Sequence, residues 1–407
     1  MNPSHTTLIT GGSGGIGLEM ARLLAPRGHR LVLASRDPGR LQAASAGRCA
    51  ARLSNLMMAA MLAGCTTLNP HHDPALPHHR PDGFNNLHVD NRRADAPSFW
   101  RWQWERLRTE LTADEPGRIG RVVLDAARLR GNRGDVTVTW IGHSTVLWQI
   151  GGLNILTDPH FGARASPVPF AGPRRLVPLP ATLDELPRID AVLISHNHYD
   201  HLDSGTVRAL AAQPGGPPLF VVPLGVDLWM RDEGIGNVRR MDWWDRIVLP
   251  GPAGEVVVHF VPAQHWSSRT PWDRDAALWG GFVVEGAAGE NAYRMLFAGD
   301  TGYSPDFKRL GEHFGGFDFA LIPVGCYEPR WFHAGMHVNE DEAVRIHLDV
   351  KSRLSMGIHW GTFRLCDEPV HAPLDELPRA RARHGVHEEA FVLFKMGQTR
   401  VLHPGAR

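Results

Sequence analysis

Histidine and aspartate side chains cluster where apolar, strand-like segments of the chain end. The segment AVLISHNHYDHLD carries His196, His198, Asp200 and His201 directly after an apolar run. Residues two apart in an extended loop point to the same side, so His196 and His198 can reach one ion while Asp200 and His201 turn toward another. Imidazole nitrogen and carboxylate oxygen are natural zinc ligands.

Three more residues of these types follow later apolar segments: His265 ends EVVVHFVPAQH, Asp300 ends RMLFAGD, and His359 stands in LSMGIHW. Buried strands that deliver ligands at their ends give a catalytic site its rigidity. Closed structural zinc sites are rich in cysteine, and this set contains none. The pattern therefore predicts a catalytic metal centre.

The elements that must position these residues are short strands rich in Val, Ile, Leu and Phe, with helical segments between some of them. The clearest helix is predicted in HVNEDEAVRIHLDV, where Asn339 can cap the start and Glu342 stands three residues later. Such a mixture predicts an α/β fold of four layers, with two packed sheets and helices outside.

Long stretches around the candidate ligands resemble the N-acylphosphatidylethanolamine-hydrolysing phospholipase D branch of the metallo-β-lactamase superfamily. They include TWIGHSTVLWQIGGLNILTDPHFG, LISHNHYDHLD, VPAQHWSSRT, FAGDTGYSPDF, IPVGCYEPRWF and MHVNEDEAVRIH, in order, and the resemblance spans about residues 66–400. It implies an αβ/βα sandwich. It also implies two Zn²⁺ ions, one held by His196, His198 and His265 and one by Asp200, His201 and His359, with Asp300 bridging.

The same resemblance assigns residues around the ions. His337, in MHVNEDE, matches a histidine near the phosphate, and with Asp200 and Asp300 it is expected to be catalytic. Asp158, in LTDP, resembles a group that orients a ligand histidine. His143, in GHST, is a second such candidate. The alternatives are that His337 is a surface residue flanking a helix and that His143 is a buried hydrogen-bonding residue.

The predicted chemistry is phosphodiester hydrolysis. Asp200, Asp300 and a bridging hydroxide would offset most of the charge of two Zn²⁺ ions, so the centre stays positive and suits a phosphodiester anion. Attack of the hydroxide on phosphorus would release N-acylethanolamine and phosphatidic acid from the family's substrate. Iron or manganese is also compatible with His and Asp ligands. The resemblance further implies a phospholipid substrate, contact with a membrane surface and a homodimer.

Three other functions compete with this one. A hydrolase of the same fold acting on a lactone or a cyclic phosphodiester would use the same ligands. A non-enzymatic envelope lipoprotein would leave the ligand set unexplained. The third is an NADP-dependent oxidoreductase, because residues 6–41, with TGGSGGIG and LASRDPGRL, resemble the first βαβ unit of short-chain dehydrogenases. No lysine stands four residues beyond any tyrosine, so that family's Tyr-x-x-x-Lys pair is missing.

We therefore expect residues 1–47 to be a truncated, partly Rossmann-like fragment. Residues 48–65 have the charged, apolar and small-residue layout of a signal peptide, and LAGC resembles a lipobox that would lipidate Cys65. Such a signal predicts a lipid-anchored protein of the bacterial cell envelope. Without it, the protein is expected in the cytoplasm or at the membrane periphery.

Residues 66–120 are expected to form a linker and a family-specific extension, and 121–407 the hydrolase domain. NPHHDPALPHHRPDGFNN should be an irregular surface segment, whereas the Trp-rich residues 99–111 predict an amphipathic helix on a membrane surface or on the core. The 43 basic and 43 acidic residues balance, which disfavours a nucleic-acid partner. The spacing of Cys49, Cys65, Cys326 and Cys366 predicts no disulfide framework.

Overall fold

The computed structural model describes residues 6–10, 30–34, 69–89, 96–270, 272–288 and 291–403. The chain separates into two compact units, Met1–Thr67 and Leu68–Arg407. In the first unit, β1 (Thr6–Thr10) and β2 (Arg30–Ala34) pair in parallel. The glycine-rich loop, the signal-like residues 48–65 and Cys65 lie outside the described residues.

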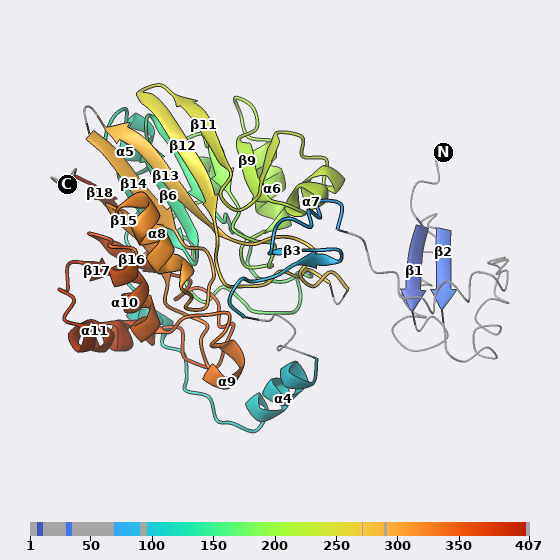
Figure 1. Cartoon of the computed structure of the whole chain (residues 1–407). Coiled ribbons are helices and arrows are strands. Elements are labelled where there is room, and N and C mark those ends of the chain that lie inside the picture. The colour runs from blue at the N-terminus through green and yellow to red at the C-terminus, as the bar shows by residue number, and fades with distance from the viewer. Residues whose placement is uncertain are drawn as a thin grey trace. The chain divides into compact units, whose positions relative to one another are not determined.

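The second unit is built on two seven-stranded sheets (Figure 1). The first has the order β10-β9-β8-β7-β6-β5-β18 and the second β11-β12-β13-β14-β15-β16-β17. The strands of the first sheet are β5 (Thr137–Gly142), β6 (Thr145–Ile150), β7 (Leu153–Thr157), β8 (Ala191–Leu193), β9 (Leu219–Pro223), β10 (Val238–Met241) and β18 (Thr399–Val401). Those of the second are β11 (Arg246–Gly251), β12 (Gly254–Val261), β13 (Gly281–Ala288), β14 (Asn291–Phe297), β15 (Phe319–Pro323), β16 (Ser355–Ile358) and β17 (Phe391–Val392).

Alternation along the strands divides the core into layers. In β6, Val146 and Trp148 belong to the large cluster that includes residues of both sheets, whereas Leu147 belongs to a second cluster with the helices that cover the first sheet. Successive side chains of a strand point to opposite faces, so a sheet covered on both sides is apolar at every position. This explains why the sequence shows continuous apolar runs here.

Helices cover the outer faces of both sheets. Val207 and Met230 pack α6 and α7 on the first sheet, and Phe307 and Ile346 pack α8 and α10 on the second. The resulting four layers confirm the αβ/βα sandwich expected from the sequence. The helices of this unit are α4 (Ala96–Arg106), α5 (Ala126–Gly131), α6 (Ser204–Ala211), α7 (Val226–Asp232), α8 (Asp306–Phe314), α9 (Arg330–His333), α10 (Glu340–Asp349) and α11 (Pro373–His384), with 3-10 turns at Pro116–Arg118 and Leu183–Glu185.

The helix predicted from its capping residues is confirmed. Asn339 accepts a hydrogen bond from the backbone N–H of Glu342, and the Glu342 carboxylate accepts one from the backbone N–H of Asn339. This reciprocal pair satisfies two backbone donors at the start of α10, which otherwise lack partners in a helix.

The extension before the sheets is attached through a buried histidine pair. His78 Nε2 lies 2.7 Å from Asp242 Oδ1, and His79 Nε2 lies 2.9 Å from Asp242 Oδ2. His78 also stacks on Trp243. The expectation that this segment is an irregular surface segment is therefore wrong for its second half, which includes the short strands β3 (His79–Arg80) and β4 (Gly83–Phe84). The contacts come from residues distant in sequence, which local composition does not register.

A second correction concerns the cysteines. Cys326 and Cys366 form a disulfide, with 4.9 Å between their Cα atoms. They are separated by 40 residues, and no motif spacing marks them as a pair. The loops after β15 and β16 bring them together, because these strands are parallel neighbours and end at the same edge.

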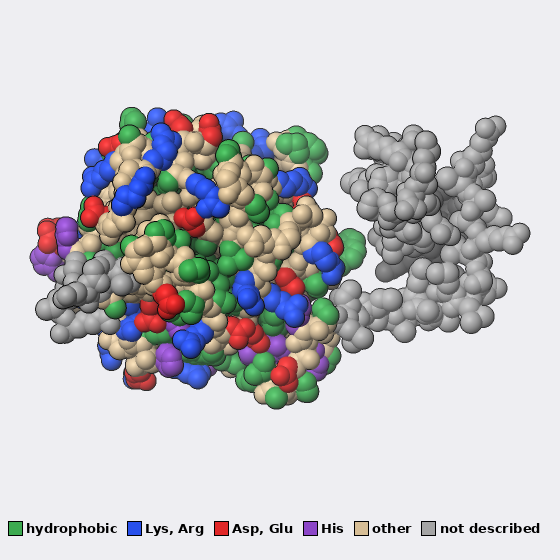
Figure 2. Space-filling model, turned by 90° about the horizontal axis from the view of Figure 1, so that it is seen from above, with side chains coloured by type: hydrophobic (Ala, Val, Ile, Leu, Met, Phe, Trp, Pro, Cys, Tyr) green, Lys and Arg blue, Asp and Glu red, His purple; other side chains and the backbone are tan. Residues whose placement is uncertain are grey.

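The distribution of charged side chains on the surface fits the equal numbers of basic and acidic residues in the sequence. Figure 2 shows Lys and Arg side chains interspersed with Asp and Glu over one face of the molecule. None of the helices in the described part of the chain has the length and apolar character needed to cross a bilayer.

The histidine pair yields a stability prediction. Replacing Asp242 by Ala leaves two buried imidazole groups without their acceptor, so the free energy of unfolding should fall by roughly 1–3 kcal/mol or more. Denaturant titration measures this change, and limited proteolysis should show faster cleavage within residues 69–89. Asp82→Ala, an exposed change in the same segment, should stay within about 0.5 kcal/mol of the parent. Equal free energies of unfolding for Asp242→Ala and Asp82→Ala would refute the inference that Asp242 attaches the extension through His78 and His79.

Candidate metal centre

The candidate ligands follow the ends of strands, and those from the second sheet follow strands that run in one direction. His196 follows β8, His265 follows β12, Asp300 follows β14 and His359 follows β16. β14, β15 and β16 are parallel, and β12 shares their direction through the antiparallel strand β13. Carboxyl ends of strands with one direction lie at one edge of a sheet, which is where α/β folds gather functional side chains.

Three imidazoles form the first group. His196 Nε2 lies 2.8 Å and His265 Nε2 lies 3.3 Å from His198 Nδ1. His196 and His265 are buried, and His198 is partly buried. Their ligand atoms lie within 4.8 Å of one another, close enough to share one metal ion.

The second group surrounds the carboxylate of Asp200. Its Oδ2 atom lies 3.1 Å from His201 Nε2 and 3.2 Å from His359 Nε2. His143 Nε2 approaches the same oxygen to 2.9 Å, so this histidine stands directly at the group. The four residues again place their ligand atoms within 4.8 Å.

Asp300 lies between the two groups. Its Oδ2 atom is 3.0 Å from His359 Nε2 and 3.2 Å from His201 Nε2. The same atom is 3.8 Å from His265 Nε2 and 4.0 Å from His196 Nε2. One carboxylate oxygen thus faces both sets of imidazoles, the position that the sequence analysis gave to a bridging ligand.

His337 faces the same carboxylate from the segment before α10. Its Nδ1 atom lies 3.9 Å from Asp300 Oδ2, and the ring is buried. This nitrogen has no hydrogen-bond partner. The structure therefore puts His337 at the centre, and the alternative that it is a surface residue flanking α10 does not fit.

Asp158 orients two of the imidazoles. Its Oδ2 atom lies 2.6 Å from His201 Nδ1 and accepts a hydrogen bond from the hydroxyl of Ser195. The same hydroxyl lies 2.9 Å from His196 Nδ1. One buried carboxylate thus sets the ring orientation in both groups, directly at His201 and through Ser195 at His196.

The charge state differs between the groups. Burial lowers the pKa of His196 and His198 well below their usual range and that of His265 to about 4, so these rings are neutral at pH 7. Burial also acts on His359, but Asp300 and Asp200 outweigh it and raise its pKa to about 9. The same carboxylates raise the pKa of His201 well above its usual range.

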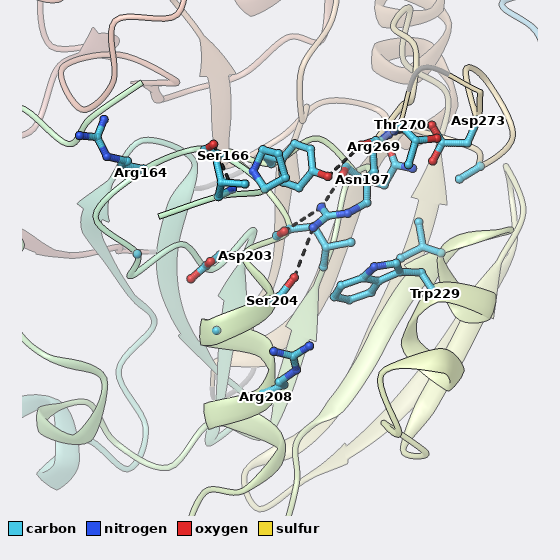
Figure 3. A pocket seen from close by; sticks show the side chains of 18 of the residues that line it. Arg164, Ser166, Asn197, Asp203, Ser204, Arg208, Trp229, Arg269, Thr270 and Asp273 are labelled. Atoms are coloured by element: carbon cyan, nitrogen blue, oxygen red, sulfur yellow. Dashed lines mark hydrogen bonds between the residues drawn. The ribbon is translucent and has the colours of Figure 1, made fainter. Parts of the chain in front are cut away.

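The ligand loop is supported from behind by Arg269. Its guanidinium donates to the backbone oxygens of Asn197 and Leu202, each at 2.8 Å, and stacks on the rings of Tyr199 and Trp229. Figure 3 shows Arg269 among Asn197, Ser204 and Trp229 at a pocket of about 850 Å³. Asn197 and Tyr199 line this pocket, whereas the alternating residues His196, His198 and Asp200 face the metal groups.

Two of these supporting residues were not identified from the sequence. Ser195 directly precedes the His-x-His-x-Asp-His motif, and that position beside the first histidine was its only signal. Arg269 stands in QHWSSRT, a stretch quoted for its family resemblance without a role. Both act through contacts that the tertiary structure creates.

Comparison with known families separates the two parts of the chain. A model of the beta-lactamase superfamily domain matches residues 153–360, which contain all seven candidate metal ligands. A model of the KR domain matches residues 5–70, in agreement with the dehydrogenase-like fragment.

Relatives of the larger part are named hydrolases. The chain is 40% identical over 269 residues to N-acyl-phosphatidylethanolamine-hydrolyzing phospholipase D 1 of Caenorhabditis elegans, a match that covers 64% of this chain and 74% of that protein. It is 27% identical over 259 residues to a metal-dependent hydrolase of Methanopyrus kandleri, a match that covers 63% of this chain and 96% of that protein.

Among solved structures, a metallo hydrolase from Ignicoccus hospitalis superposes with a TM-score of 0.50 at 19% identity. The superposition covers 66% of this chain and 99% of that one. At this identity the likeness shows the fold alone.

The different charge states predict two kinds of metal binding. An ion at Asp200, His201 and His359 must displace protons at pH 7, because the carboxylates raise the pKa of His359 to about 9 and that of His201 well above its usual range. Its affinity should rise by about tenfold per pH unit for each proton released, and the contribution of His359 should level off above about pH 9. An ion at the neutral three-histidine group should release no such protons. Calorimetric titration in buffers of different ionisation enthalpy counts the protons, and equal release at both steps would contradict this assignment.

The orienting role of Asp158 is tested by Asp158→Asn. The substitution removes the charge that holds His201 and Ser195 in place, so metal affinity should fall by about 10–100-fold. Metal retention after equilibrium dialysis reports the change. Asp232→Asn, an exposed change on α7, is the matched control and should retain the parent's metal content.

Proposed function

This chain belongs to the metallo-β-lactamase superfamily, among the relatives of N-acylphosphatidylethanolamine-hydrolysing phospholipase D, and we propose that it is a zinc-dependent phosphodiesterase. It hydrolyses N-acylphosphatidylethanolamine to N-acylethanolamine and phosphatidic acid. The observation that carries this proposal is the carboxylate of Asp300 between two groups of metal-ligand residues. Superfamily membership already makes the chain a metal-dependent hydrolase.

The residues fit a pair of divalent cations. Ring nitrogens face one another at short distance, an arrangement that suits a shared cation better than it suits neighbouring N–H groups. Buried atoms at the centre have no hydrogen-bond partner, among them His198 Nε2 and Asp300 Oδ1. Two zinc ions in these groups would supply positive charge for a phosphodiester and lower the pKa of a water molecule toward about 7.

The protein's own side chains then hold and orient the reacting groups. Burial keeps the pKa of His337 well below its usual range, so its imidazole is neutral and can donate a hydrogen bond to a phosphate oxygen beside Asp300. At the group around Asp200, the side chains of Asp200 and His143 form a buried hydrogen-bonded pair. These groups are held in place before substrate arrives, which is the condition for electrostatic stabilisation of a transition state.

An exposed aromatic surface supports a lipid substrate. On α4, Trp100 is 68% and Trp104 is 56% exposed, whereas Trp102 is buried and stacks on Phe332 of α9. Arg108 lies over the Trp104 ring at 4.0 Å. Aromatic rings beside cationic side chains suit the interface between phospholipid headgroups and acyl chains. We therefore propose that α4 touches the lipid surface and that lipidation at Cys65 anchors the protein in the bacterial cell envelope.

The proposed reaction is tested on the full chain loaded with zinc. N-acylphosphatidylethanolamine in detergent micelles should yield N-acylethanolamine and phosphatidic acid in equal amounts by mass spectrometry. Asp300→Asn should lower turnover by at least about a hundredfold, because the residue facing both metal groups loses its charge. Asp232→Asn should match the parent.

The outcomes separate this proposal from its alternatives. A chain that binds two zinc ions without forming either product is not this phospholipase, and lactones and cyclic phosphodiesters become the substrates to assay. Near-parental turnover of Asp300→Asn would reject the assigned centre itself.

A further inference from the structure

One segment outside the ligand set contacts an imidazole of each metal group. It runs from Gly325, after β15, to Met336, before α10. The backbone oxygen of Gly325 lies 3.2 Å from His359 Nδ1, and that of Met336 lies 2.9 Å from His265 Nδ1. Both oxygens accept the ring N–H opposite the nitrogen that faces the centre. The segment 325–336 therefore sets the tautomer and orientation of one ligand in each group.

This segment is attached to the loop after β16 by two independent links. The first is the disulfide between Cys326 and Cys366. The second is the partly buried carboxylate of Glu368, which accepts hydrogen bonds from the backbone N–H groups of Cys326, Tyr327 and Glu328. The loop after β16 begins with His359 itself, so the links join the segment to a ligand-bearing loop.

The backbones at this junction are in close contact. A Cβ atom at Gly325 would lie 2.3 Å from the backbone oxygen of His359, so no side chain fits there. Cys326 next to it has a φ of 66°. A non-glycine residue in this region persists only where its surroundings hold it. The disulfide and Glu368 are the attachments that hold Cys326.

We propose that the Cys326–Cys366 disulfide positions the metal ligands His359 and His265, so that breaking it weakens metal binding while the chain stays folded. The inference rests on the proposed metal centre and adds a redox dependence to it. The two cysteines are positioning residues, because they act through the backbone oxygens of the segment and not on substrate.

The redox chemistry of the disulfide determines the conditions under which it can affect metal binding. Reduction by a dithiol or a phosphine adds two electrons and two protons, breaks the S–S bond and leaves two thiols. Disulfides persist in oxidising compartments and are reduced in a bacterial cytoplasm. The centre should therefore reach its full metal affinity after export, which agrees with the proposed location in the cell envelope.

The test compares Cys326→Ala, Cys366→Ala and the double variant with the parent, all as full chains. Zn²⁺ affinity is measured by equilibrium dialysis, Co²⁺ binding by its visible absorption spectrum, and stability by thermal unfolding of the metal-free proteins. Each single variant should bind Zn²⁺ about 10–100-fold more weakly than the parent, with an altered Co²⁺ spectrum. The double variant should equal the single ones, because either change alone removes the bond.

A bond with only a structural role gives a different result. The unfolding temperature of the metal-free variants would fall, while Zn²⁺ affinity and the Co²⁺ spectrum stayed at parental values, and that result overturns the inference. A parent that binds no metal overturns the proposed centre as well. A parent that binds two ions without hydrolysing the phospholipid rejects the proposed substrate and leaves this inference standing if the variants still bind more weakly.

Chemical reduction provides a second test that does not depend on the folding of the variants. The folded, metal-free parent is treated with tris(2-carboxyethyl)phosphine, the phosphine is removed under argon, and Zn²⁺ affinity is measured. The parent should lose affinity to the level of the double variant, and the double variant itself should not respond. Unchanged affinity of the reduced parent contradicts the proposal.

Discussion

The structure depends on the burial of two carboxylates, Asp200 and Asp300, among imidazole rings at one edge of two packed sheets. Buried carboxylates are costly unless cations or hydrogen-bond donors surround them. Without metal, His201 and His359 meet that need by holding protons. With metal, the cations take the place of those protons. The two carboxylates are therefore compensated in both states, by protons on the imidazoles without metal and by an excess of positive charge with it, which explains how so many polar groups can remain in the interior.

Rigid elements define where these groups stand. Ligands from both sheets follow strands, and those of the second sheet follow strands of one direction, so their positions depend on the sheet hydrogen bonds rather than on long loops. Continuous apolar strands keep the helices and sheets closely packed on both sides. A centre held in this way needs little rearrangement when it binds an anion, and this preorganisation is the main source of electrostatic catalysis.

Hydrogen bonds from neighbouring residues fix the orientation of the ligand imidazoles. Asp158 and Ser195 orient His201 and His196 from one side, and the backbone oxygens of Gly325 and Met336 orient His359 and His265 from the other. Arg269 holds the ligand loop by its backbone oxygens. The rings of His201, His265 and His359 are thus fixed by partners on other segments, and the disulfide connects the segment of Gly325 to the loop of His359.

The sequence by itself determined the ligand types, their places after apolar strands, the capped helix α10 and the superfamily. All of these depend on residues that are neighbours in the chain, such as the spacing of His196, His198, Asp200 and His201. The tertiary structure alone decided that Cys326 pairs with Cys366, that Arg269 holds the ligand loop, and that Asp242 holds a histidine 164 residues away. Such contacts join distant segments, and their geometry follows from how the sheets and loops pack, which no local pattern of residues encodes.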